Sequence, residues 1–175
     1  MFISANNGLA STAISREGKS FWVSKIIPVS PFVQVLSKLA AASLVPLMLI
    51  AMTLAGEIIF LHFSASELFS QMILALSGSL LTMSFGLFID LLHPKLDWTD
   101  PQQVMKRNLT VLISIFSTLA FVGLSGGFLY WLAANFTLSP STIVKLITVI
   151  YILLLGLMLW LINNRAEKLY SNIKP

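Results

Sequence analysis

Two carboxylates interrupt otherwise apolar stretches of this sequence, and their positions are the first places where chemistry could occur. Glu57 lies near one end of an apolar run, and Asp90 lies at the end of the next run. An ionisable side chain inside an apolar, membrane-crossing segment is costly and commonly marks a transport pathway or an interhelix contact. Glu57 is a candidate for such a role, unless it simply reaches the membrane surface. We expect Asp90 to cap its helix or to pair with Lys95 or Arg107.

Other arrangements that support catalysis are missing from the sequence. The chain has no cysteine, which excludes disulfides and thiolate metal sites. The two histidines, His62 and His93, are far from each other and from any cluster of carboxylates. There is no phosphate-binding loop, dinucleotide motif or nucleophile elbow. We therefore expect no enzyme activity, catalytic residue, metal or cofactor, no nucleic-acid partner, and no ATP hydrolysis by this chain alone.

The composition places the chain in a lipid bilayer. Of its 175 residues, 57% are hydrophobic and only 10% are charged, whereas a soluble domain carries about 25% charged residues. Spans near the 20 residues that a bilayer core requires must be helical, because only helices satisfy their own backbone in lipid. The sequence thus predicts an all-α integral membrane protein, a bundle of four transmembrane helices over residues 39–61, 70–92, 109–133 and 142–162.

Three helix starts share one pattern, a capping residue followed by proline. The pairs are Ser30-Pro31, Asp100-Pro101 and Ser139-Pro140. Ten of the 11 Lys and Arg residues lie on one side of the predicted spans, and Lys145 alone lies on the other. Because basic loops stay in the cytoplasm, we expect both termini and the 93–108 loop to be cytoplasmic.

The region before the first span mixes cations with aromatic and aliphatic residues. Residues 1–38 are predicted to form a cytoplasmic or interfacial segment, amphipathic in character, with Phe21 and Trp22 directed toward lipid. An ordinary anchor belt is the plainer alternative. The four-helix region then occupies residues 39–164, and residues 165–175 form a cytoplasmic tail.

Small residues recur at four-residue spacing in two of the spans. Such spacing lets membrane helices approach closely. The candidate helix-packing positions are Gly78, Thr82 and Gly86 in the second span and Gly123 and Gly127 in the third.

Two stretches resemble permeases of the ABC-2 type. "STAISREGKSFWVSKIIPVSPFVQVLSKL" is similar to the segment before a membrane helix in these permeases, and "DLLHPKLDWTDPQQVMKRNLTVL" is similar to a loop of bacterial ABC exporter permeases. The resemblance covers about 50 residues. It implies a membrane subunit of the bacterial cell (inner) membrane that works with a separate ATP-binding cassette subunit to export a substrate. Family members are longer, so we expect the chain to be the C-terminal portion of a permease, with the remaining helices or a second copy as partners.

The resemblance also suggests where the ATP-binding subunit would be coupled. The candidate positions come from both stretches, and they are Arg16, Glu17, Lys19, Asp97, Trp98 and Asp100. Trp98 could instead rest at the level of the lipid headgroups. A small accessory protein that stabilises another membrane protein is the alternative function, and a membrane-embedded enzyme is disfavoured.

Overall fold

The computed structural model describes residues 8–98, 109–136 and 139–173 of the chain. Two short helices and a 3-10 turn lead into four long helices. They are α2 (Gly8–Ser11), η1 (Ser15–Ser20), α3 (Phe21–Ile26), α4 (Pro31–Phe60), α5 (Ala65–Leu92), α7 (Leu109–Asn135) and α8 (Pro140–Asn172). The described residues contain no strand, and the four long helices are long and apolar enough to cross a membrane. The chain is therefore an all-α, multi-pass membrane protein, as predicted.

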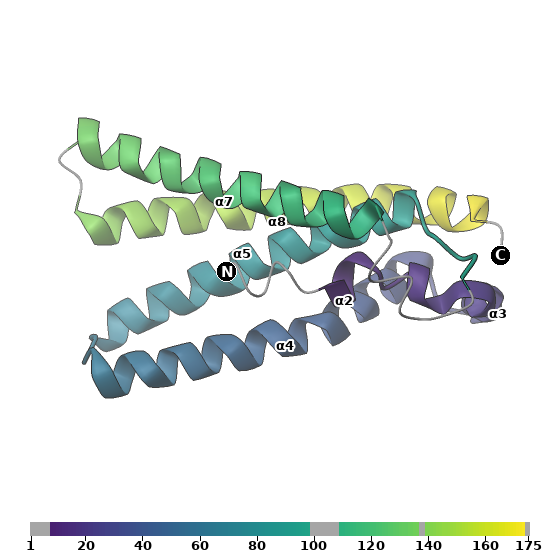
Figure 1. The fold of residues 1–175 in the computed structure, drawn as a ribbon, viewed down its shortest axis with the longest axis horizontal. Coiled ribbons are helices and arrows are strands. Elements are labelled where there is room, and N and C mark those ends of the chain that lie inside the picture. The colour runs from purple at the N-terminus through teal and green to yellow at the C-terminus, as the bar shows by residue number, and fades with distance from the viewer. Residues whose placement is uncertain (1–7, 99–108, 137–138, 174–175) are drawn as a thin grey trace.

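The four long helices lie side by side as two hairpins, α4 with α5 and α7 with α8 (Figure 1). Helix α5 is the centre of the bundle because it packs against α4, α7, α8 and α2. Half of its most apolar window is buried inside the protein, compared with 11% for α7. Helix α7 consequently presents most of its surface outward.

The two helix starts that can be compared follow the proline rule. Helix α4 begins at Pro31 and α8 at Pro140, and the Ser139 hydroxyl accepts a hydrogen bond from the Thr142 amide. The Ser30 side chain makes no capping hydrogen bond with a described residue, so the predicted cap is wrong at that position. The Asp100-Pro101 start lies outside the described residues.

The helices extend beyond the predicted spans at the ends that leave the membrane. Helix α5 begins at Ala65, five residues earlier than expected, because Ser64 and Glu67 form a reciprocal capping box. Helix α8 continues to Asn172, so most of the predicted tail is helical. Its last turns bury Tyr170 against Phe21, with ring centroids 5.0 Å apart.

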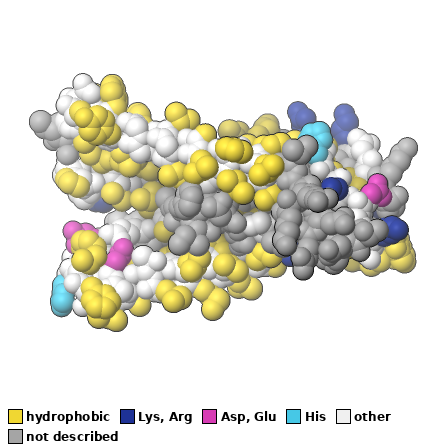
Figure 2. All heavy atoms as spheres, viewed as in Figure 1, with side chains coloured by type: hydrophobic (Ala, Val, Ile, Leu, Met, Phe, Trp, Pro, Cys, Tyr) yellow, Lys and Arg dark blue, Asp and Glu magenta, His cyan; other side chains and the backbone are white. Residues whose placement is uncertain are grey.

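Polar side chains mark two levels along the bundle. In each of three helices, two of them lie 19 or 20 residues apart: Lys38 and Glu57 in α4, Gln71 and Asp90 in α5, and Lys145 and Arg165 in α8. At 1.5 Å per residue these separations are about 30 Å, the thickness of a bilayer's hydrocarbon core. Figure 2 shows the same division on one face, with Lys and Arg gathered mainly near one end and hydrophobic side chains along the length. We call the end that carries Lys38, Asp90 and Arg165 the basic end.

Candidate functional site

The basic end contains a buried polar junction centred on Asp90. The Asp90 side chain is fully buried, and one carboxylate oxygen accepts hydrogen bonds from the backbone amides of Ile14 (2.7 Å) and Ser15 (3.0 Å). The other oxygen accepts a hydrogen bond from the Ser15 hydroxyl. The prediction that Asp90 caps its own helix or pairs with Lys95 is wrong, because its described partners belong to the segment before α3; Arg107 lies outside the described residues. Asp90 thereby fastens that segment to the end of α5.

The residues after α5 join the same junction through Ser15. The Lys95 amide donates to the Ser15 hydroxyl at 2.9 Å, and the Trp98 indole nitrogen donates to the Ser15 carbonyl at 2.8 Å. The Trp98 ring lies over Gly18, whose φ is +51°. A Cβ at Gly18 would come within 2.7 Å of the ring and would require a backbone conformation that favours glycine. Trp98 is thus engaged inside the chain, and Gly18 makes its position possible.

A second link ties η1 to α4. Lys38 of α4 forms an ion pair with Glu17, and the Ser24 hydroxyl donates to the same carboxylate at 2.7 Å. Both charged side chains are about four-fifths buried, so solvent screens this pair less than a surface pair. The segment Ser15–Ser20 is therefore bound to α4, to α5 and to the residues that follow α5.

The predicted coupling residues divide into two groups. Glu17 and Trp98 make the internal contacts described above. Arg16, Lys19 and Asp97 are exposed at the basic end, where the Arg16 guanidinium donates to the Leu9 carbonyl at 2.9 Å. Asp100 lies outside the described residues. Among the candidates that the structure describes, Arg16, Lys19 and Asp97 are therefore the ones whose exposed side chains are available to a partner.

Glu57 lies at the end of the bundle opposite the basic end, and it pairs between two helices. The Gln71 side-chain amide of α5 is assigned with its nitrogen toward Glu57, because only that orientation pairs a donor with the carboxylate. The nitrogen then lies 2.9 and 2.6 Å from the two carboxylate oxygens of Glu57. The carboxylate therefore has an interhelix partner, one of the two roles expected for it. Lys145 lies near Gln71, since both line the same surface pocket between α5 and α8.

The small residues of the second span occupy the buried face of α5. Gly78, Thr82 and Gly86 are all buried. A Cβ at Gly86 would lie 2.8 Å from the Ser114 hydroxyl and 3.1 Å from the Ser11 Cβ, so this glycine permits a close approach of α5 to α7 and α2. In contrast, no described atom lies within 4 Å of a Cβ built at Gly123 or Gly127. The prediction that these two pack within the bundle is wrong for contacts inside this chain, because they face outward from α7.

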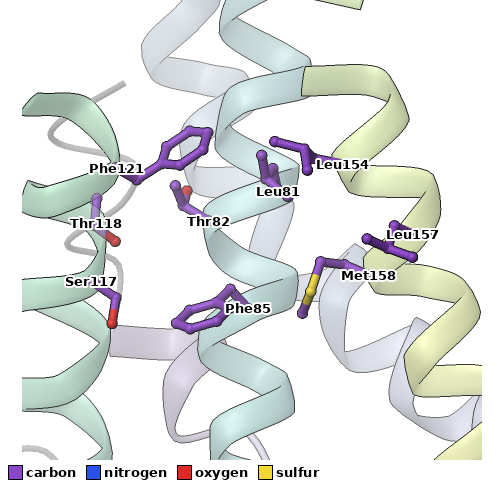
Figure 3. A pocket seen from close by; sticks show the side chains of 9 residues that line it. All are labelled: Leu81, Thr82, Phe85, Ser117, Thr118, Phe121, Leu154, Leu157 and Met158. Atoms are coloured by element: carbon purple, nitrogen blue, oxygen red, sulfur yellow. The ribbon is translucent and has the colours of Figure 1, made fainter. Parts of the chain in front are cut away.

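A groove of about 280 Å³ opens between α5, α7 and α8 (Figure 3). Leu81, Thr82 and Phe85 line it from α5, and Ser117, Thr118 and Phe121 line it from α7; the α8 wall is formed by Leu154, Leu157 and Met158. None of these lining residues carries a charge. The sequence reading missed the groove because nothing in the individual spans shows which faces meet.

The chain was compared with protein-family models, with curated proteins and with solved structures, and none of the three comparisons finds a match.

Proposed function

We propose that the chain is the membrane-spanning part of an ABC-2-type exporter in a bacterial cell membrane. In this proposal both termini and the 93–108 loop face the cytoplasm, and a separate ATP-binding cassette subunit supplies the energy. Further permease helices, or a second copy, complete the assembly. The ten basic residues on one side of the spans support the orientation.

One observation carries the proposal. The two stretches that resemble the permease family are separated by some 50 residues of sequence, yet they meet in the junction at the basic end. Ser15 from the first stretch contacts Asp90, Lys95 and Trp98 from the second. Two segments that each resemble the same permease family are expected to be in contact if both serve one function. The exposed side chains Arg16 and Lys19 lie beside that junction.

The proposal is tested by purifying the tagged chain from bacterial membranes in mild detergent together with a candidate ATP-binding cassette subunit. The expected result is retention of that subunit and ATP hydrolysis by the complex. Replacing Arg16, Lys19 and Asp97 together by alanine should weaken retention of the subunit. The effect should be larger at low salt, because high salt screens the interactions of exposed charges that the substitutions remove. Lys145→Ala, a charge change at the opposite end, is the matched control.

Two outcomes would overturn the exporter proposal. One is that no ATP-binding cassette subunit is retained under conditions in which the chain remains folded. The other is that the triple variant retains the subunit as well as Lys145→Ala does. Either result favours the second candidate, an accessory protein that stabilises another membrane protein. The outward-facing Gly123 and Gly127 of α7 support that candidate, since close helix contacts in membranes use small residues.

A further inference from the structure

A polar pocket at the end of the bundle opposite the basic end holds two opposite charges that do not pair. The pocket has a volume of about 350 Å³ and lies between the starts of α5 and α8, which occupy the same end of the bundle (Figure 1). Glu67 of α5 and Lys145 of α8 both line it. The two side chains form no ion pair with each other, and Lys145 forms none with any other residue that the structure describes.

Both charged groups retain hydrogen-bonding capacity. One Glu67 oxygen accepts the hydrogen bonds of the capping box, from the Ser64 amide at 2.9 Å and from the Ser64 hydroxyl at 2.6 Å. The other Glu67 oxygen accepts none from a described residue, and the ammonium of Lys145 donates to none. The nearby Glu57 carboxylate is already paired with Gln71. Toward the described part of the chain, the pocket therefore has one unpaired ammonium and one unpaired carboxylate oxygen.

The depth of the pocket matches that of lipid headgroups. Gln71 and Lys145 lie at the boundary of the hydrocarbon core, and the pocket extends outward from them to Ser66 and Pro140. Five residues of helix in each case amount to about 7.5 Å. The headgroup region on each side of a bilayer core is about 5–8 Å thick. The pocket therefore lies where phospholipids carry their charges.

The surface of α8 that continues from the pocket toward the membrane centre is apolar and exposed. Lys145, Val149 and Leu153 follow one another at four-residue spacing, so they share one face of the helix. Val149 is 56% exposed and Leu153 is 68% exposed. A lipid whose headgroup reaches Lys145 can lay a hydrocarbon chain along this face, whereas a water-soluble phosphate ester has no group that would use it.

We propose that the pocket binds the headgroup of phosphatidylethanolamine, with the phosphate at Lys145 and the ammonium group at Glu67. Both charges of this zwitterionic headgroup then meet an opposite charge. Phosphatidylglycerol, which is anionic, would be attracted by Lys145 and repelled by Glu67. In phosphatidylcholine, methyl groups replace the N–H donors that the carboxylate would accept. The proposal does not depend on the exporter function, since this chain alone forms the pocket, far from the exposed charges of the basic end.

The test is native mass spectrometry of the purified chain in mild detergent, titrated separately with the three phospholipids. We expect phosphatidylethanolamine to bind most tightly. Lys145→Gln should weaken its binding about fivefold, the effect expected of one cation at a lipid surface. Glu67→Gln preserves the capping box, and it should weaken phosphatidylethanolamine but strengthen phosphatidylglycerol. Partial unfolding would weaken both lipids, so these opposite changes identify a charge effect.

Matched controls come from the basic end of α8, where Glu167→Gln and Lys168→Gln make the same changes at exposed positions. Neither control should alter the order of the three lipids. The proposal is overturned if phosphatidylglycerol binds the unaltered chain as tightly as phosphatidylethanolamine, or if Lys145→Gln has no larger effect than Lys168→Gln. Glycerophosphoethanolamine carries the same headgroup without acyl chains, and its displacing the lipid at equal concentration would overturn the assignment to a membrane lipid.

Discussion

Replacing Asp90 by alanine gives the sharpest test of the junction at the basic end. The substitution removes the acceptor for the Ile14 and Ser15 amides and for the Ser15 hydroxyl, and all of these donors belong to fully buried residues. Each buried donor left without a partner costs about 1–3 kcal/mol. The two amides alone therefore predict a loss of about 2–6 kcal/mol in the free energy of unfolding. At about 2–4 °C per kcal/mol for a chain of this size, the melting temperature should fall by about 4–24 °C.

The assay is thermal unfolding in detergent combined with hydrogen exchange of the backbone amides. Asp90→Ala should lower the melting temperature and increase exchange in residues 10–20 more than in the distant half of α8. Asp90→Asn keeps an acceptor oxygen for the amides and should lose about half as much, since it forfeits charge-assisted bonds. The control is Asp97→Ala, an exposed position where changes stay within about 0.5 kcal/mol. Equal melting temperatures for Asp90→Ala and Asp97→Ala would refute the reasoning.

Three further predictions concern packing, the opposite end and topology. Gly86→Ala should destabilise the bundle measurably in the same thermal assay, whereas Gly123→Ala should leave it unchanged or slightly more stable, because only the first added methyl meets other side chains. Glu57→Ala and Gln71→Ala should show a coupling of about 0.6–1.7 kcal/mol in a double-mutant cycle, and additive effects would argue against their hydrogen bond. A cysteine placed at Asp97 should resist membrane-impermeant reagents added to intact bacteria, and its labelling from outside would contradict the cytoplasmic orientation.

Local rules were sufficient to predict the helices but not their full length. The helix starts at Pro31 and Pro140 follow from the preference of proline for the first helical position, which involves only neighbouring residues. A hydropathy profile detects the apolar part of a helix that matches the bilayer core, so a span predicted from it ends where polar residues begin. Helix α8 continues to Asn172 because Tyr170 is buried against Phe21, a contact that no hydropathy window contains.

The candidate site was harder to predict because its contacts join distant segments. Asp90 was recognised as unusual from its apolar surroundings, but its partners lie some 75 residues earlier in the chain. Glycine spacing had a similar limit. Gly86 and Gly123 both belong to sets of small residues at four-residue spacing. Gly86 nevertheless lies against α2 and α7, whereas Gly123 faces outward from α7. The spacing of small residues predicts a helix face without bulky side chains, but it does not predict which other helix packs against that face.

The junction connects the exposed residues of the basic end to the long helices through buried hydrogen bonds and an ion pair. Ser15 contacts Asp90 of α5 and Trp98 beyond it, and Glu17 is paired with Lys38 of α4. Because these links all originate within Ser15–Ser20, a displacement of that segment must move both helices or break buried hydrogen bonds. A partner that binds Arg16 and Lys19 more tightly in one position of Ser15–Ser20 would therefore stabilise that position, together with the positions of α4 and α5 that accompany it. The reason is that a ligand shifts an equilibrium toward the state that it binds better.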